Sequence, residues 1–410
     1  MIRKNLLQLL FSGSCIWRWN DKLRPVELSE IDKQAHKMLV AFPLAHEQAI
    51  RLSPAEARNL YTRVIEGALF DYLYRLVITD IKPPVFYKIK ENPEHYQKLT
   101  NYVLKRLEPT MQPLGAFWER MKSWHENWQD PADSARRILS AAHLFASQWE
   151  FKLIKPHNPF DEEIESISRS FEVMLDEYAD LPALAQIRDP SDALGKFANL
   201  CGQLRFQVRW TQVPRMPATS VLGHTFMVAA LAYLYSISRN SSQIRANNNF
   251  FSGLFHDFPE LLTRDIISPV KSSVPELSQI IKNYEESELE RRILSPLRKA
   301  GFTALTERII FFLGLEIGSE FQESCLVDGH SKEIADYRHL DRIDSDNLDP
   351  KDGRLIKLCD LLAAFLEAHN SIATGISSSH LYDARARLKR RLIEDSIEGM
   401  NLEALLADFD

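Results

Sequence analysis

The sequence predicts an all-α fold built as two tandem helical domains, and three observations support this. Only 14 of the 410 residues are glycine, which indicates few tight turns. Long stretches are rich in Leu, Ala, Glu and Arg, which favour helices over strands. The chain also resembles itself, because several segments of the first half recur in the same order in the second. A chain of this length can bury two separate cores.

The clearest repeat joins residues 68–85, ALFDYLYRLVITDIKPPV, to residues 253–270, GLFHDFPELLTRDIISPV. The two segments align without a gap, and seven positions are identical. Three further matches keep the same order, with loops of different length between them. The matched residues are Arg18-Trp19 with Arg209-Trp210, His36 with His224, and His143 with Asp360. This pattern predicts an old duplication, with domains at residues 1–188 and 189–410.

Charge and cysteine content exclude several classes of function. The net charge is −6 and no long basic block occurs, so extended DNA or RNA is not an expected partner. The four cysteines lie far apart without CxxC spacing, which predicts neither a zinc ribbon nor a disulfide framework. Reduced thiols fit a cytoplasmic protein. No stretch reaches the roughly 20 apolar residues that span a bilayer, so no membrane partner is expected.

The first residues allow two interpretations, because a short apolar run before Cys15 is also compatible with a lipoprotein signal. Leu6, Leu7, Leu10 and Phe11 nevertheless fall at helical spacing. Their surroundings match the segment that precedes Arg209-Trp210 in the second half. We therefore expect the first helix of a domain here.

Four residues of the second half form a candidate metal site. His224, the pair His256-Asp257, and Asp360 each lie in an apolar, helix-like segment. Singly, each fits a satisfied core histidine or a capping aspartate, and a lone His-Asp pair is expected by chance among 12 histidines. Together they provide two imidazoles and two carboxylates, a set that suits Mn, Co, Ni, Fe, Zn or Mg. Acids inside a core need such a partner.

The order of these residues resembles the HD-domain superfamily, in which a histidine precedes a His-Asp pair and a distant aspartate. Within it, the chain resembles the bacterial HD-domain 5′-deoxynucleotidases over about residues 195–400. The resemblance is carried by Arg209-Trp210, His224, the run HDFPELLTRDIISPVK at residues 256–271, and KLCDLLAAFLEA around Asp360. It implies two tandem HD-type domains, the N-terminal one degenerate.

The resemblance also implies roles for individual residues. His224, His256, Asp257 and Asp360 would hold one divalent metal ion. Glu260 would orient or deprotonate the attacking water, and a carboxylate four residues after His256 faces the same side of a helix. Arg209 and Trp210 would hold the phosphate and the nucleoside. Asp265 and Lys271 would line the sugar and phosphate side; helix capping or a surface ion pair explains these two equally.

Two departures from the family pattern stand out. Gly223 precedes the first histidine, where the family often has an acidic residue, so the support of His224 is expected to differ. The first half lacks the acidic set, because Asp71 and Tyr72 stand opposite the His-Asp pair and Arg75 opposite Glu260. We expect no hydrolysis there and a structural role packing on the second half.

Two charged segments have ordinary explanations. The acidic stretch at residues 339–353 does not fit the EF-hand spacing and is expected to be a solvated loop. The basic stretch at residues 381–392 has helix-surface spacing and is expected to be a final helix.

The sequence therefore predicts a metal-dependent phosphohydrolase that releases phosphate from nucleotides, with 5′-(deoxy)nucleoside monophosphates as substrates. Two alternatives stay open. One is an HD-type nucleoside triphosphohydrolase or phosphodiesterase, and the other is a nucleotide-sensing protein without turnover. A small-molecule nucleotide is the expected partner, and a homo-oligomer is compatible with the sequence.

Overall fold

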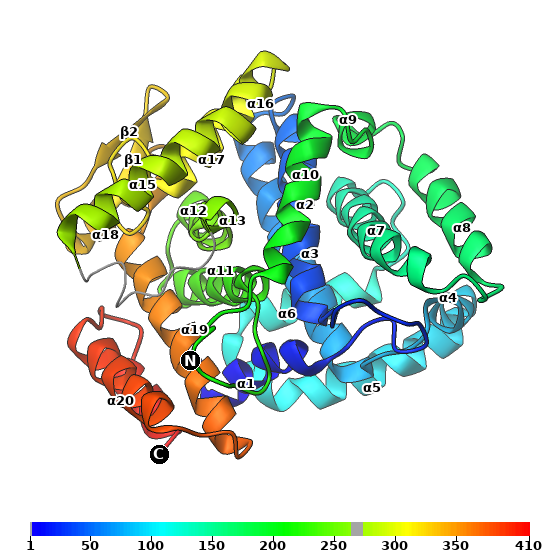
Figure 1. Cartoon of the computed structure of the whole chain (residues 1–410), viewed down its shortest axis with the longest axis horizontal. Helices are drawn as coiled ribbons and strands as arrows, with labels where there is room; N and C mark the ends of the chain where they lie inside the picture. Colours follow the sequence, from blue (N-terminus) through cyan, green and yellow to red (C-terminus); the bar gives the residue numbers. More distant parts are fainter. Residues whose placement is uncertain (1, 264–273) are drawn as a thin grey trace.

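The structure is a computed structural model that describes residues 2–263 and 274–410, and it confirms the all-α class (Figure 1). The helices of the first half are α1 Lys4–Ser12, α2 Glu30–Ala49, α3 Pro54–Ile78, α4 Pro83–Glu91, α5 Pro93–Met111, α6 Ala116–Glu126, α7 Ser134–Ile154, α8 Ile164–Asp176 and α9 Leu184–Arg188. Those of the second half are α10 Ala193–Gln203, α11 Val221–Ser238, α12 Gln243–Phe255, α13 Glu260–Thr263, α15 Pro275–Leu289, α16 Ser295–Lys299, α17 Thr303–Leu313, α18 Tyr337–Ile343, α19 Gly353–Ala373, α20 Ser379–Glu394 and α21 Leu402–Ala407.

Both halves begin with the same local structure. A first helix ends in a short 3₁₀ turn, at 13–15 in one half and 204–206 in the other. An isolated antiparallel bridge follows, Trp17 with Ser29 and then Val208 with Ser220. Each serine caps the next helix by accepting a hydrogen bond from the backbone amide three residues further on, which satisfies a free donor of the first turn. The two halves thus start alike, while the duplication and the boundary at residue 188 both stay predictions.

The core is shared between the halves. One contiguous set of buried apolar side chains runs from α1 to α21, and α2 of the first half packs along α11 of the second. In Figure 1 the first half lies mostly to the right and the second to the left, with α2 and α11 near the middle. The residues around the candidate site are therefore supported by helices of both halves.

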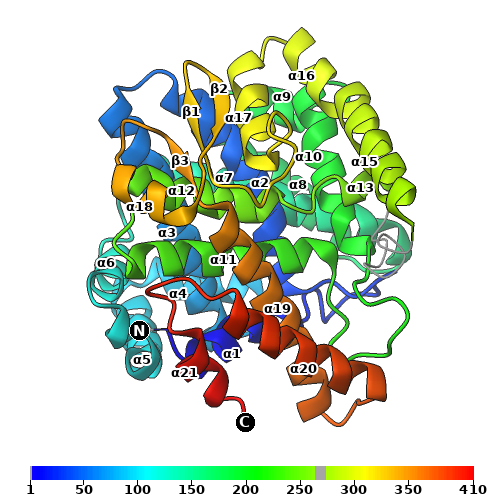
Figure 2. The ribbon, with the colours of Figure 1, turned by 90° about the vertical axis from the view of Figure 1, so that its left-hand side faces the viewer.

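The central helix α11 is apolar on all sides. Within the described residues it is the one helix long and apolar enough to cross a membrane by length and composition, a test that core helices also pass. Of its 18 residues, 89% are buried inside the molecule, against α2, α12 and α19 (Figure 2). Its composition is thus explained by its place in the core.

Close packing of α11 on α12 depends on Gly253. A Cβ atom at this position would lie 2.9 Å from Cα and 3.0 Å from the backbone nitrogen of Ala229. Backbone cannot move aside as a flexible side chain does, so we expect Gly253→Ala to cost about 1–3 kcal/mol of unfolding free energy. Chemical denaturation should order the stabilities as wild type, then Gly253→Ala, then Gly253→Ser. An alanine variant as stable as the wild type would contradict this packing.

A small antiparallel sheet was not predicted. Its strands are β1 Ser324–Val327, β2 His330–Glu333 and β3 Pro350–Lys351, in the order β2-β1-β3. Ser324 pairs with Glu333 on one side and with Lys351 on the other. The sheet leads directly into α19, the helix that carries Asp360.

The acidic stretch at residues 339–353 is not the solvated loop that the sequence suggested. Arg245, 1% exposed, forms ion pairs with Asp341, Asp344 and Asp352. Asp352 also caps α19, because it accepts a hydrogen bond from the amide of Leu355. The carboxylates therefore tie the start of α12 to the start of α19. The basic stretch at 381–392 lies in helix α20, as expected.

Candidate metal centre

Three helices of the second half bring the candidate ligands together. His224 lies in the first turn of α11, directly after the residue bonded by the capping Ser220. His256 and Asp257 follow the last residue of α12, and Asp360 lies in the second turn of α19. The apolar patterns of α11 and α19 predicted these helices, and both side chains of the two histidines are buried.

The donor atoms of three predicted ligands form one cluster. One donor atom each from His224, His256 and Asp257 lies within 4.8 Å of the others. The Asp257 Oδ2 atom is 3.2 Å from His256 Nε2 and 3.8 Å from His224 Nε2. Asp360 contacts this cluster through His224, because its Oδ1 atom lies 3.1 Å from Nε2 of His224. The four residues are thus neighbours, although Asp360 is placed beside the cluster of three.

The environment of His256 fits a metal ligand. Its Nδ1 lies 2.8 Å from the carbonyl oxygen of Gly253, so Nδ1 carries a proton and Nε2 is the nitrogen that faces the cluster. Burial opposes a charge here, yet the carboxylates of Asp257 and Asp360 raise the pKa of His256 to about 9. The site therefore favours positive charge strongly, as a divalent-cation site must.

The carboxylates are held in their ionised form. Burial opposes ionisation, but His256 and then Arg209 lower the pKa of Asp257 below its usual range. Lys357, one turn before Asp360, lies 2.8 Å from its Oδ2 and lowers the pKa of that carboxyl. Lys357 was not among the predicted site residues. Two ionised carboxylates are hard donors and two imidazoles are borderline donors. Together they fit Mn, Co, Ni, Fe, Zn or Mg.

Arg209 and Trp210 lie at the edge of this cluster. The Arg209 Nη1 atom is 3.3 Å from Asp257 Oδ2, and its Nε is 3.3 Å from Glu367 Oε2. Trp210, which has a φ of 61°, donates its indole N–H to the same Glu367 oxygen at 2.7 Å. Glu367 thus fixes both side chains and also lies 3.5 Å from Nδ1 of His224.

Glu367 is a further candidate site residue, which was not predicted from the sequence. It is buried, and Arg209 and His224 lower its pKa well below the usual range although burial opposes this. The sequence contained a signal for it, because Glu150 and Glu367 each follow the matched residues His143 and Asp360 by seven positions. Two helical turns separate it from Asp360, so both face the same side of α19.

Glu260 is buried near the candidate ligands, but it does not lie on the same helix as the residues before His256. Helix α12 ends before His256, a turn follows, and Glu260 begins the separate helix α13. The expectation of a continuous helix from His256 to Glu260 is therefore wrong. Both residues and Asp257 nevertheless line one cavity of about 250 Å³, bounded further by α15 and residues 313–320. Gln207 holds this turn by donating to the Glu260 carbonyl oxygen at 2.9 Å. Asp265 and Lys271 lie outside the described residues.

Gly223 is explained by a contact between the halves. The carboxylate of Asp32, on α2, lies 2.7 Å from the place that a Gly223 Cβ would occupy. Its Oδ1 also accepts a hydrogen bond from the capping Ser220 at 2.5 Å. An acidic side chain at position 223 has no room, because Asp32 already stands there. The first half thus supplies a carboxylate beside the start of the helix that carries His224.

In the first half, Lys33 takes the position that corresponds to His224. Ser29 and Ser220 cap their helices in the same way, and Lys33 and His224 are each the fourth residue after their cap. Lys33 Nζ lies 2.5 Å from Nδ1 of His143, the residue that matches Asp360 in the sequence. The predicted match of His36 with His224 is wrong. His36 lies one turn further on, and its Nε2 contacts a backbone carbonyl of α10 instead.

Comparison with known proteins agrees with this geometry. The family model described as "HD domain" matches residues 201–389, the segment that holds every described site residue. Residues 201–389 are an HD domain. The match does not extend to the first half.

Relatives of the HD domain include two proteins named 5′-deoxynucleotidase. One is from Yersinia pestis (strain Pestoides F) and the other from Yersinia pseudotuberculosis serotype O:3 (strain YPIII). Each is 23% identical over 199 residues, which cover 48% of this chain and 82% of the relative. The HD domain and these relatives support a metal-dependent phosphohydrolase.

Proposed function

We propose that the HD domain releases phosphate from 5′-nucleoside monophosphates, with deoxynucleotides as the preferred class. The observation that carries this proposal is the joint placement of His224, His256 and Asp257 against Arg209 and Trp210. A cation-binding cluster next to a guanidinium and an indole suits a ligand with a phosphate and a nucleoside. The name of the relatives supports the same substrate class.

The site residues divide the chemical work. A divalent ion held by His224, His256, Asp257 and Asp360 would make a bound water acidic and polarise the phosphoryl oxygen. Arg209 offers a fork of N–H donors to phosphate oxygens, and Glu367 holds that fork in place. Trp210 presents its ring while its N–H is engaged by Glu367. Glu260, in the same cavity as His256, accepts the proton of the attacking water in this proposal.

The test is a substrate panel with metal-depleted protein. We expect no turnover after chelation, and restored release of inorganic phosphate from dAMP, dGMP or dTMP when Mn²⁺ or Co²⁺ is added. Product analysis separates the alternatives, because triphosphate release and opening of a cyclic or diester bond give different products. Metal analysis is run on the same samples. A protein that binds the metal stoichiometrically and turns over none of these substrates would contradict the proposal and favour a nucleotide sensor.

A further inference from the structure

The positions in the first half that match the metal site carry a different charge. Three carboxylates and two imidazoles surround the candidate metal centre, whereas two cations, one carboxylate, a tyrosine and a histidine occupy the matched positions. The matched residues are Lys33 for His224, Asp71 for His256, Tyr72 for Asp257, Arg75 for Glu260 and His143 for Asp360. The second half therefore needs an added cation, and the first half already contains its own.

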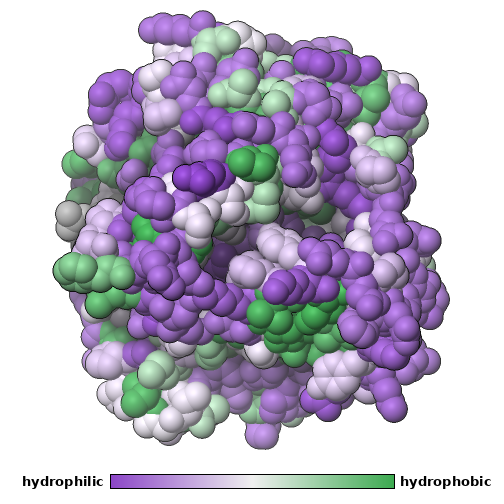
Figure 3. Space-filling model, turned by 90° about the vertical axis from the view of Figure 1, so that its right-hand side faces the viewer, coloured by the Kyte–Doolittle hydropathy of each residue, from purple (hydrophilic) through white to green (hydrophobic). Residues whose placement is uncertain are grey.

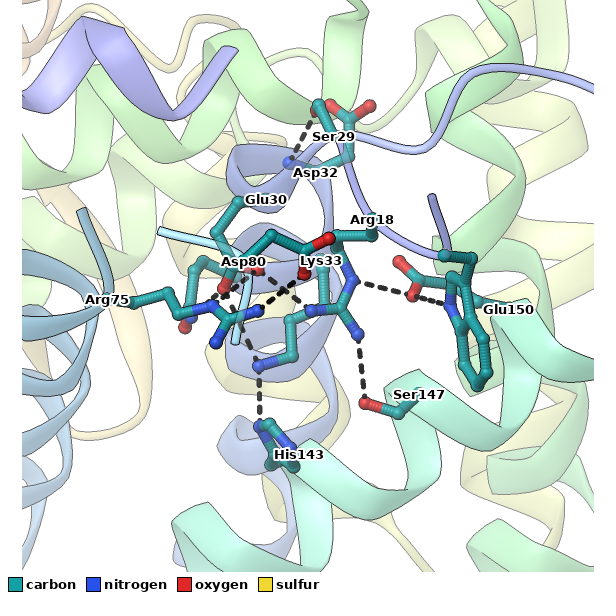
Figure 4. A network of polar contacts seen from close by, with 12 residues as sticks. Arg18, Ser29, Glu30, Asp32, Lys33, Arg75, Asp80, His143, Ser147 and Glu150 are labelled. Atoms are coloured by element: carbon teal, nitrogen blue, oxygen red, sulfur yellow. Dashed lines mark hydrogen bonds and ion pairs between the residues drawn. The ribbon is translucent and has the colours of Figure 1, made fainter. Parts of the chain in front are cut away.

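Within the described residues, Lys33 is buried without a close carboxylate partner. Its side chain is 2% exposed, and its Nζ donates to Nδ1 of His143 at 2.5 Å. The nearest carboxylate oxygen, Oε1 of Glu30, lies 3.8 Å away and already accepts from Gln34 at 2.7 Å. The other oxygen of Glu30 accepts from Arg18 at 2.8 Å. Figure 4 shows Lys33, Arg75 and Arg18 converging on this single carboxylate.

The other acids nearby are also engaged. Glu150 accepts from Arg18 through one oxygen and from Arg205 through the other, each at 2.8 Å. Asp71 lies 3.4 Å from the ammonium of Lys37. Burial and the surrounding cations, Lys33 first, lower the pKa of His143 well below its usual range, so this ring stays neutral. Burial, with Arg18 and Lys37 nearby, also lowers the pKa of Lys33 well below its usual range although Glu30 opposes this, so the protonated form of Lys33 needs a further negative partner.

Arg75 stands at the solvent side of the cluster. Its Nη2 is 3.1 Å from Asp80 and its Nε is 3.7 Å from Glu30, and its side chain is 19% exposed. The side chain of Asp71 is 40% exposed, so water reaches this region. Figure 3 shows that the right-hand side of the molecule in Figure 1 is hollowed near its centre. Because part of its side chain is exposed, Arg75 can be reached by a small anion, and Lys33 lies near the same Glu30 carboxylate as Arg75.

The arrangement of Arg209, Trp210 and Glu367 has a counterpart in the first half. Arg18 Nε and Trp19 Nε1 both bond one oxygen of Glu150, at 2.8 and 2.9 Å, just as Arg209 and Trp210 bond Glu367. The Trp19 ring, however, packs on Phe151 and on Phe171 of α8, with centroids 5.6 and 6.5 Å away. A base cannot stack on that face. The retained features suit the phosphate group of a ligand, and not its nucleoside.

We infer that the first half binds a phosphate group without metal, with Lys33 and Arg75 as its direct partners. The ligand is inorganic phosphate or the terminal phosphate of a phosphate monoester. Two cations at these positions provide charge-assisted hydrogen bonds, which are the strong ones. The added negative charge also favours the protonated form of Lys33, which burial opposes. This inference does not depend on turnover in the HD domain.

The test is calorimetric titration of the full chain with inorganic phosphate in the presence of a chelator. We expect Arg75→Gln and Lys33→Gln to weaken binding about tenfold or more, because each removes one charge-assisted contact. Arg106→Gln is the matched control, since it removes an exposed guanidinium on α5 of the same half and should leave this affinity unchanged. Melting temperatures show that each variant is folded, and Arg75→Gln, which is partly exposed, keeps the test valid if Lys33→Gln does not fold.

A second arm repeats the titration with dAMP to identify the ligand. Loss of phosphate affinity in Arg75→Gln assigns inorganic phosphate, and loss of dAMP affinity alone assigns a monoester. The inference is overturned if the chelated wild type binds neither ligand, or if Arg75→Gln binds both as the wild type does. It is overturned equally if Arg209→Gln, and not Arg75→Gln, removes the binding.

Discussion

Replacing His256 by alanine should reduce phosphate release by about a hundredfold or more and remove the bound metal. Loss of an outer partner of a metal ligand already costs about 10–100-fold, and His256 supplies the ligand atom itself. Its Nε2 lies 3.2 Å from Oδ2 of Asp257, while its Nδ1 is engaged by the Gly253 carbonyl oxygen. Activity, metal content and melting temperature are measured on the same preparation after loading with Mn²⁺.

The matched control is His330→Ala, a histidine of the same domain whose side chain is 81% exposed. We expect it to keep both metal and activity. Asp257→Ala should follow His256→Ala, because it removes another atom of the same cluster. If His256→Ala is folded and retains wild-type turnover with a full complement of metal, the candidate metal centre is not the site of the chemistry.

The helices that carry the site could be predicted from sequence because their apolar patterns are long. α11 and α19 enclose His224 and Asp360 in continuous buried stretches, so periodicity alone defines them. The end of α12 could not be placed, because FHDFPELL contains no glycine and its single proline fits the first turn of a new helix as well as a break. Because the break could not be located, the sequence suggested one continuous helix from His256 to Glu260.

Alignment of the halves failed where a residue type was followed instead of the helix start. His36 was matched to His224 because both are histidines, which requires a three-residue shift relative to the preceding Arg-Trp pair. The caps Ser29 and Ser220 show that no shift occurs. A cap determines which side chains of the first turn face the core, so it is a better anchor than residue identity.

The polar contacts between distant segments could not be predicted at all. Asp32 fills the space beside Gly223, and Asp352 pairs with Arg245, yet nothing in the local sequence links these residues. The acidic stretch around Asp344 looked solvated because charged residues usually are. Its partners come from α12, about a hundred positions earlier in the chain, and only the packed fold brings them together.

Glu260→Gln should separate metal binding from catalysis. The amide keeps the size of the carboxyl but cannot accept a proton, so we expect kcat to fall about 10²–10⁴-fold while metal content stays at the wild-type level. Stopped assays of turnover, with metal analysis of each sample, measure both quantities.

Glu286→Gln provides the matched control, because Glu286 lines the same cavity on α15 and pairs with Lys282 at 4.0 Å. It removes the same charge from the same pocket without touching the turn after His256, and we expect turnover within a few-fold of wild type. A comparable loss in both variants would mean that the cavity's total charge matters more than a base at position 260. If Glu260→Gln keeps full activity, Glu260 does not accept the proton of the attacking water. Another group that faces the ligands must then accept it, and Asp257 is a carboxylate in the right place.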